Sequence, residues 1–191
     1  ELELKFLPSG GSFFDEKTCL ALQENTIEPK EILKIFDGEI WKFQDPIPGK
    51  HYITGVDTAP EFGADNSAIT IWDYETLEQV WEYQGKLKVL DFIKVIKYAC
   101  SQYPGTIVAE NNSYGNQVCE ELNNSEFMTM IYKEKRGENK VMSGLSTNAK
   151  TRPLMIDAMY TYVTQFPEMV KSKRTSLELI GLISNKNGKV E

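Results

Sequence analysis

Two acidic residues stand at the ends of apolar runs, where their chemistry is most constrained. Asp57 ends the run 52–57 (YITGVD), and Glu110 follows the run 106–109 (TIVA). A carboxylate at the end of a buried strand is costly to desolvate unless it is paired or binds a cation. Hard divalent cations such as Mg²⁺ prefer oxygen ligands. Two such strand ends in one sheet therefore predict a metal site and phosphoryl-transfer chemistry.

Each acid has a predicted role and a simpler interpretation. Asp57 would bridge two Mg²⁺ or Mn²⁺ ions, and Glu110 would bind one of them. Asp65 would orient a metal-bound water or assist as a base. Asp57 and Asp65 could instead be turn residues, because Asp is common in turns. Glu110 is harder to explain in that way, since a buried carboxylate needs a partner.

The periodicity of apolar residues predicts the elements that would carry these acids. Strands are expected at 51–57, 67–73 and 79–84, close in sequence and antiparallel. They are followed by alternating helices and strands, expected at 89–103 (helix), 106–109 (strand), 114–122 (helix), 129–132 (strand) and 151–166 (helix). This order is typical of an α/β, ribonuclease H-like fold with a mixed sheet. A Rossmann-type sheet is the alternative, but no Gly-rich phosphate loop follows the first strand.

The chain of 191 residues fits one domain, or one domain with an attached subdomain. Residues 45–49 (DPIPG) form the strongest linker signal, so we place the boundary there. Residues 1–45 would be a linker subdomain, with a strand over 1–7 and a short helix over 28–36. Residues 46–191 would form the main domain, which ends in a short helix over 176–183. Asp73 and Asp91 are expected to be ordinary surface residues.

Charge is unevenly distributed along the chain. The net charge of −7 argues against a nucleic-acid partner, but residues 133–174 carry nine basic and four acidic residues. Such a region could bind a DNA backbone, where affinity comes from phosphate neutralisation. It could equally be a solvated loop. The candidate DNA-binding residues are Lys133, Lys135, Arg136, Lys140, Lys150 and Arg152.

Other features of the sequence exclude several classes. No apolar run approaches the roughly 18–20 residues that span a bilayer, and nothing resembles a signal peptide. The three cysteines have no metal-site spacing and are expected to be reduced core residues. The lone His51 is expected to be structural or at the surface.

In this order, the motifs resemble the nuclease domain of the large terminase subunit, the DNA-packaging motor of tailed bacteriophages. The resemblance covers essentially the whole chain, and residues 6–14 (FLPSGGSFF) look like the segment that leaves the family's ATPase domain. Residues 48–59 (PGKHYITGVDTA) are similar to the lead-in to its first nuclease acid, and 65–68 (DNSA) to the following Asp-x-Ser element. Residues 108–115 (VAENNSYG) resemble the second acid motif. Residues 147–156 (TNAKTRPLMI) resemble the start of the basic helix, and 185–191 (NKNGKVE) the approach to the third acid motif.

The resemblance implies an endonuclease that cuts concatemeric double-stranded phage DNA at the start and end of packaging. It implies two Mg²⁺ or Mn²⁺ ions, an upstream ATPase domain, and contacts with the portal protein and the small terminase subunit. The expected location is the host cytoplasm, transiently at the procapsid portal, without membrane contact. The family's third acid motif, usually His-Asp-Asp, is expected just past Glu191, so the site would be incomplete here and the activity of the isolated chain would be weak or absent. No phosphate-binding loop for ATP is present in this sequence.

Two alternatives stay open on the sequence. The chain could be another ribonuclease H-like nuclease, such as a junction resolvase, with the same acids and a different substrate. It could also be a non-catalytic DNA-binding or motor-docking module. The second alternative predicts salt-sensitive DNA binding that needs neither a metal nor Asp57.

Overall fold

The structure is a computed structural model that describes residues 11–60, 65–136, 140–184 and 190. The strand expected over 1–7 lies outside the described residues. Contacts divide the chain into two compact units, one being Pro29–Thr151 and the other the described residues up to Glu28 and from Arg152 onward. The predicted domain boundary after residue 45 stays a prediction. In the described parts of the chain, no helix has the length and apolar character that crossing a membrane requires.

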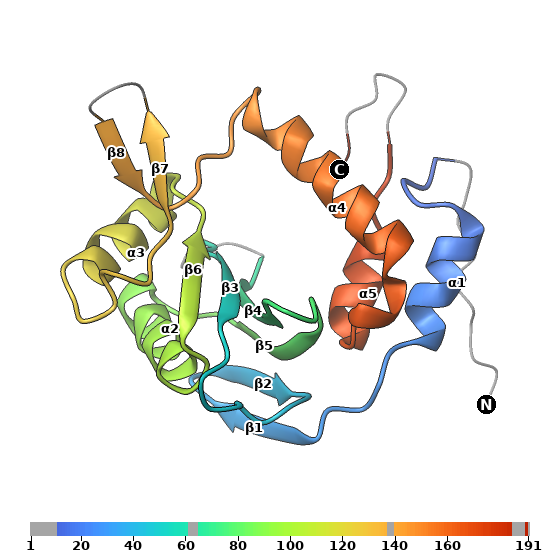
Figure 1. Ribbon diagram of the computed structural model, residues 1–191, viewed down its shortest axis with the longest axis horizontal. Helices are drawn as coiled ribbons and strands as arrows, with labels where there is room; N and C mark the ends of the chain where they lie inside the picture. Colours follow the sequence, from blue (N-terminus) through green and yellow to red (C-terminus); the bar gives the residue numbers. More distant parts are fainter. Residues whose placement is uncertain (1–10, 61–64, 137–139, 185–189, 191) are drawn as a thin grey trace. The chain divides into compact units, whose positions relative to one another are not determined.

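A six-stranded sheet in the order β1-β2-β5-β4-β3-β6 is the centre of the Pro29–Thr151 unit (Figure 1). Its strands are β1 (Glu31–Ile35), β2 (Gly38–Lys42), β3 (Tyr52–Asp57), β4 (Ser67–Asp73), β5 (Gln79–Gly85) and β6 (Gly105–Ala109). In the part of the sheet ordered β1-β2-β5-β4-β3, every pair of neighbouring strands is antiparallel. The last strand, β6, is parallel to β3. The predicted antiparallel strands and the mixed sheet are therefore confirmed.

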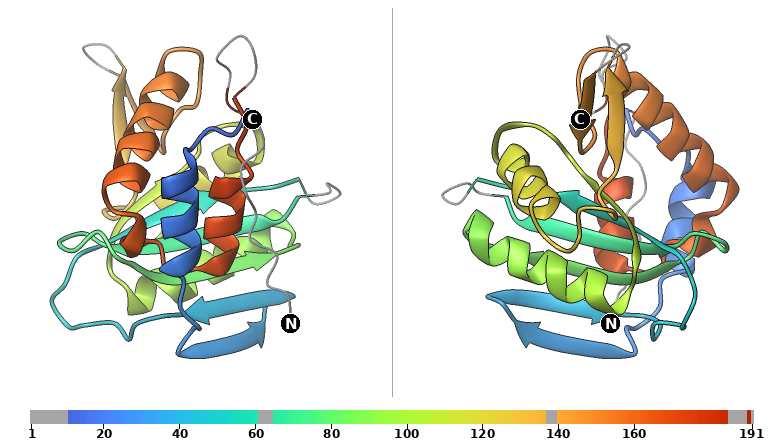
Figure 2. Two further views of the ribbon diagram at one scale, coloured as in Figure 1. Left: turned by 90° about the vertical axis from the view of Figure 1, so that its right-hand side faces the viewer. Right: turned by 60° about the vertical axis from the view of Figure 1, so that its left-hand side comes forward.

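Two helices cover one face of this sheet and form the core with it. These helices are α2 (Val89–Gln102) and α3 (Ser113–Asn123). Both lie on the same side of the sheet in Figures 1 and 2. The core joins sheet residues such as Val56 and Ile107 to Phe92 of α2 and Val118 of α3. Because side chains alternate along a strand, residues next to these buried ones point to the other face.

A second, smaller sheet follows α3. It consists of the antiparallel strands β7 (Lys133–Arg136) and β8 (Lys140–Ser143). The strand expected over 129–132 is reduced to a single parallel bridge between Ile131 and Ile107 of β6. Backbone hydrogen bonds from Ile107 N to Met130 O and from Tyr132 N to Ile107 O, both 2.8 Å long, fasten this segment to the free edge of β6.

The helix expected over 28–36 is wrong, because these residues form β1 and the turn that joins it to β2. The turn residues Phe36 and Asp37 have φ values of 55° and 47°. Two successive positive φ values are typical of the type I′ turn, whose twist suits a two-residue hairpin. The Tyr83 hydroxyl donates a hydrogen bond of 2.7 Å to the Phe36 carbonyl and fixes the turn on β5.

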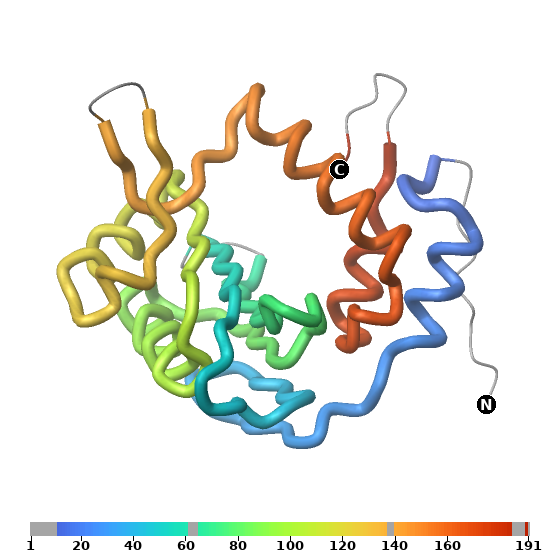
Figure 3. The backbone as a smooth tube through the Cα atoms, in the orientation of Figure 1, coloured from blue at the N-terminus to red at the C-terminus, as the bar shows by residue number. Residues whose placement is uncertain are grey.

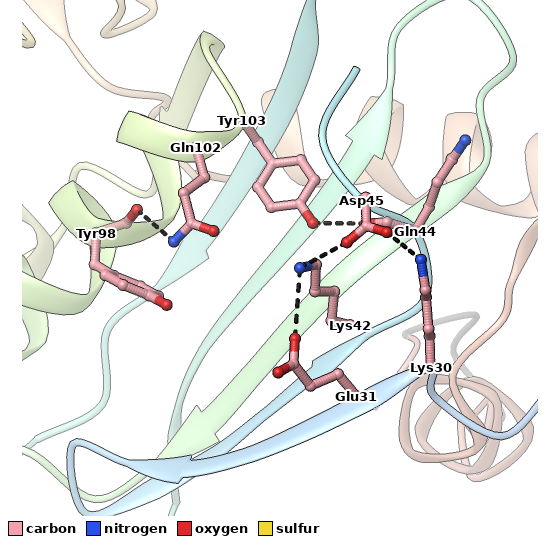
Figure 4. A network of polar contacts seen from close by, with 8 residues as sticks. All are labelled: Lys30, Glu31, Lys42, Gln44, Asp45, Tyr98, Gln102 and Tyr103. Carbon is pink, nitrogen blue, oxygen red and sulfur yellow. Dashed lines mark hydrogen bonds and ion pairs between the residues drawn. The ribbon is translucent and has the colours of Figure 1, made fainter. Parts of the chain in front are cut away.

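A polar network fixes the chain after β2, at the edge of the sheet (Figure 4). Lys42 forms ion pairs with Asp45 at 2.8 Å and with Glu31 at 3.4 Å, and Lys30 also pairs with Asp45. The hydrogen bonds from Lys30 and Lys42 lower the pKa of Asp45 to about 2. The Tyr103 hydroxyl donates to the Gln44 carbonyl at 2.6 Å. Residues 30–45 are thus tied to the end of α2, so this network is structural.

Asp73, which was expected at the surface, is 1% exposed. Its carboxylate accepts hydrogen bonds from the backbone of Glu75 at 2.8 Å and of Thr76 at 3.1 Å. It also pairs with Lys50 at 2.6 Å. The tight turn between β4 and β5 is therefore built around this carboxylate. Asp91, by contrast, has a side chain that is 47% exposed and pairs with Lys94 at the surface.

The other compact unit is helical. It holds α1 (Glu16–Glu24), most of α4 (Thr151–Gln165), the short 3-10 helix η1 (Pro167–Met169) and α5 (Lys173–Ile180). The last helix begins earlier than the expected 176. Phe14 stacks on Tyr160 of α4 with the rings 5.7 Å apart. The Phe13 amide donates to the Leu182 carbonyl at 2.9 Å. These contacts join the segment before α1 to α4 and to the segment after α5.

Candidate functional site

Asp57 and Glu110 follow neighbouring parallel strands at the same level. Val56 of β3 pairs with Ala109 of β6, so the next residues, Asp57 and Glu110, stand side by side. A hydrogen bond of 3.3 Å from the Glu110 amide to the Val56 carbonyl continues the strand pairing up to the acids. Since Val56 and Ala109 are both buried, both carboxylates point to the opposite face of the sheet. The expected juxtaposition of the two acids is present.

The electrostatics of Asp57 reflect this arrangement. Burial raises the pKa of its carboxyl, and the negative charges of Glu110 and Asp65 raise it further, while a hydrogen bond from the Thr58 backbone lowers it. Part of the Asp57 residue is nevertheless exposed to solvent. Neighbouring carboxylates that raise a pKa by mutual repulsion are the arrangement that a divalent cation stabilises.

Asp65 lies in the loop that leads into β4 and is exposed. The hydroxyl of Ser67, two residues later, is buried and accepts a hydrogen bond of 3.1 Å from the Ala59 amide. Asp57 itself pairs with Ala68 of β4. Ser67 therefore holds Ala59, which follows β3, at the beginning of β4. The charge of Asp65 lies near enough to Asp57 to raise the pKa of the Asp57 carboxyl.

Within the residues that the structure describes, no group of three or more His, Cys, Asp or Glu side chains is placed to hold a metal ion. The pair of Asp57 and Glu110 would therefore need further oxygen ligands. Mg²⁺ is often held by one or two carboxylates together with waters and substrate phosphates. The two acids fit that mode of binding, and their role as metal ligands stays a prediction.

A glycine allows α3 to begin directly behind Glu110. A Cβ atom on Gly115 would lie 1.8 Å from the Glu110 carbonyl oxygen. Ser113, at the start of α3, has a φ of 38°, which is rare for a residue other than glycine. Our sequence interpretation did not single out Gly115, although a glycine in the first turn of a helix is a signal of close backbone approach.

Four of the six candidate DNA-binding residues lie together on the β7–β8 hairpin, as Lys133, Lys135, Arg136 and Lys140. Arg136 pairs directly with Lys140 across the strands. Like charges directly opposite each other are destabilising unless an anion is near. Arg136 is partly compensated by Glu134 at 3.3 Å.

The other two candidates lie elsewhere. Lys150 is exposed just before α4, and Arg152 belongs to the helical unit, where it donates a hydrogen bond of 3.2 Å to the Val190 carbonyl. His51 is exposed and contacts Thr106 at 2.9 Å, in agreement with a structural role. The three cysteines are buried and free, as expected.

The antiparallel strands β5, β4 and β3, joined by the parallel strand β6 and with acids at the carboxyl ends of β3 and β6, form a ribonuclease H-like arrangement. No family model matches the chain, and no curated protein matches it. Similarity is found among solved structures, and it concerns large terminase nucleases of phages.

The large terminase nuclease of thermophilic phage G20c with bound magnesium has a TM-score of 0.66 and 15% identity, covering 96% of this chain and 88% of that chain. The same nuclease with bound zinc has a TM-score of 0.60 and 15% identity, covering 91% of each chain. The large terminase nuclease domain of Thermus phage P74-26 has a TM-score of 0.61 and 15% identity, covering 91% of this chain and 83% of that chain. The chain therefore has the fold of large terminase nuclease domains, and the predicted ribonuclease H-like fold is confirmed.

Proposed function

We propose that this chain is a metal-dependent endonuclease domain that cuts double-stranded viral DNA during genome packaging. The observation that carries the proposal is the in-register position of Asp57 and Glu110 at the ends of β3 and β6. The pKa of Asp57, which burial and then the charge of Glu110 raise, supports the proposal, because a bound cation would stabilise the ionised carboxylate against both effects. The neighbours in fold are nucleases, one with bound magnesium and one with bound zinc.

Asp57 and Glu110 would hold Mg²⁺ or Mn²⁺. When bound, such an ion stabilises the charge on a phosphate and lowers the pKa of a coordinated water. The chain's own contribution is to fix two carboxylates on rigid strands, so that their positions change little during the reaction. Asp65 would orient the attacking water or take up its proton. A site with two ions needs more oxygen ligands than these two carboxylates.

The β7–β8 hairpin would bind the DNA backbone. Its cations Lys133 and Lys135 are exposed and lie on one face of the hairpin, because they are two residues apart. Lys140 faces Arg136 across the strands, a repulsion that a phosphate would relieve. Contacts of this kind bind DNA without reading its sequence.

The remaining parts of the proposal concern the longer protein. The substrate would be concatemeric DNA, and the partners would be an ATPase domain of the same polypeptide, the portal protein and the small terminase subunit. The reaction would take place in the host cytoplasm, at the procapsid portal. The support for these parts is the likeness to large terminase nucleases, which covers most of the chain.

A substrate panel tests the proposed activity. In Mn²⁺, the chain is expected to cut DNA weakly, because its two acids need further oxygen ligands, and to cut linear duplex DNA at least as well as four-way junctions or RNA–DNA hybrids. Glu110→Gln, which removes a charge and keeps the shape of the side chain, is expected to abolish cutting. A strong preference for junctions would favour a junction resolvase instead.

The role of the hairpin is tested by the salt dependence of DNA binding in the presence of a chelator. Each lost phosphate contact lowers the slope of log K against log salt by about 0.9. Lys133→Ala and Lys135→Ala are expected to lower it by about that amount, and Lys94→Ala, which removes an exposed lysine from α2, is the control. Equal slopes for all variants would contradict the proposed role.

A further inference from the structure

The chain that leaves the hairpin is fastened to the segment of the second acid. Figure 3 traces it from β8 back to the end of β6. Leu145 forms a parallel bridge with Glu110, in which the Leu145 amide donates to the Ala109 carbonyl at 2.8 Å and the Asn111 amide donates to the Leu145 carbonyl at 2.7 Å. The backbone on both sides of Glu110 is thus held by one residue.

The side chain of Asn111 secures the same segment. Its Nδ2 donates a hydrogen bond of 2.5 Å to the Ser143 carbonyl, at the end of β8. Its Oδ1 is buried and accepts no hydrogen bond from the residues that the structure describes. The amide therefore acts on the hairpin through its donor. The Ser143 hydroxyl in turn donates to Asn123 Oδ1 at the end of α3, at 3.1 Å.

Gly144 is the residue that makes this close approach possible. Its φ is 85°, and a Cβ atom there would lie 2.5 Å from Cys119 Sγ, 2.8 Å from the Ala109 carbonyl oxygen and 3.0 Å from Asn111 Cβ. Only glycine fits both the backbone conformation and the space. Replacement of Gly144 would push the segment away from β6 without changing Asn111.

We propose that Asn111 is a positioning residue, which fixes Glu110 by holding the exit of the β7–β8 hairpin against β6. The proposal rests on the proposed function, since Glu110 is placed there as a metal ligand. The Glu110 amide also donates to the Val56 carbonyl, but at 3.3 Å this bond is longer than the two backbone bonds of Leu145, at 2.7 Å and 2.8 Å. The shorter bonds of Leu145 therefore contribute to how firmly the backbone of Glu110 is held. The hydrogen bond from Asn111 to Ser143 also fixes the position of the β7–β8 hairpin, and thus of its cations, relative to Glu110.

The experiment compares Asn111→Ala and Gly144→Ala with Asn116→Ala, in which the same change is made at an exposed position of α3. Hydrogen exchange of the segments 109–111 and 143–146 is measured by mass spectrometry. Binding of Mn²⁺ is followed by electron paramagnetic resonance without DNA, and duplex binding is followed with a chelator. Neither Mn²⁺ binding nor exchange depends on catalysis.

For Asn111→Ala, we expect exchange in both segments to become about fivefold faster, since one net hydrogen bond is worth about 1 kcal/mol and 1.4 kcal/mol is a factor of ten. The Mn²⁺ concentration for half-saturation should rise at least severalfold. Gly144→Ala should do the same, whereas Asn116→Ala should leave both unchanged. DNA binding in chelator should stay within about twofold of the parent.

Unchanged exchange in Asn111→Ala would overturn the proposal. Faster exchange with unchanged Mn²⁺ binding would also overturn it, because the contact would then be structural only. If the parent binds no Mn²⁺, the proposed function fails, and the exchange result alone then decides whether Asn111 holds the hairpin exit.

Discussion

Two substitutions of Asp73 separate the charge of this buried carboxylate from its hydrogen bonds. Oδ1 accepts from the amides of Glu75 and Thr76, and Oδ2 pairs with Lys50. Asp73→Asn keeps an oxygen for both amides and loses the charge. Asp73→Ala loses everything and leaves two backbone donors of the turn without their acceptor.

The magnitudes follow from these contacts. A hydrogen bond to a charged group is worth roughly 1.5–3 kcal/mol, and a buried group left unpaired costs about 1–3 kcal/mol. We therefore expect Asp73→Ala to lower the free energy of unfolding by about 3 kcal/mol and Asp73→Asn by about 1 kcal/mol. Asp91→Ala removes an aspartate that is 47% exposed and should cost less than about 0.5 kcal/mol.

Urea unfolding followed by tryptophan fluorescence suits this test, because the three tryptophans, Trp41, Trp72 and Trp81, all lie in the Pro29–Thr151 unit. The signal therefore reports on this unit alone. Equal losses for Asp73→Ala and Asp91→Ala would refute the reasoning, and equal losses for the two Asp73 variants would mean that the turn hydrogen bonds contribute little.

The pH dependence gives an independent check on the same carboxylate. Burial acts to raise the pKa of Asp73, but the hydrogen bonds from Lys50, Thr76 and Glu75 and the charge of Lys50 outweigh it, so the pKa lies below 3.8. A lowered pKa means that the stabilisation is complete above pH 3.8 and is lost as the pH falls through the folded-state pKa. The difference between the parent and Asp73→Asn should follow that course.

Three further predictions concern the same unit. Gly115→Ala should destabilise it by at least about 2 kcal/mol in the same titration, because the new Cβ would lie 1.8 Å from the Glu110 carbonyl oxygen; an unchanged midpoint would contradict this. Burial and then the charge of Glu110 raise the pKa of Asp57, so its ionisation costs stability above pH 3.8. Asp57→Asn should therefore raise the urea midpoint at neutral pH. The gain in the free energy of unfolding should be less than about 1 kcal/mol and should vanish below pH 3.8. Burial raises the pKa of Cys100 and of Cys119 to about 11, so a thiol reagent at neutral pH should modify them only in urea; rapid labelling of the folded chain would contradict their burial.

The central strands and the acid pair could be predicted because local sequence determines them. The runs that became β3, β4 and β6 are largely apolar, and an acidic residue ends or directly follows each of them. A strand parallel to β3 after a helix places its carboxyl end beside that of β3, and this is sufficient to bring Glu110 next to Asp57.

The hairpin of β1 and β2 could not be predicted in the same way. A type I′ turn is usually marked by Asn-Gly or Asp-Gly, but here Phe36 and Asp37 occupy its two central positions. The turn is stabilised by the hydroxyl of Tyr83, which is distant in sequence. Asp73 was misread for a related reason, since the partner Lys50 is 23 residues away. Gly144 likewise has meaning only through its contacts with β6 and α3.

The most direct test of the proposed function is cleavage of supercoiled plasmid in Mn²⁺ by the parent chain, Asp57→Ala and the matched control Asp91→Ala. All three should have the same tryptophan fluorescence, which shows that the sheet is intact. The proposal predicts cutting by the parent and by Asp91→Ala, and none by Asp57→Ala. Cutting by Asp57→Ala at the rate of the parent would contradict the proposed role of Asp57 at the metal site.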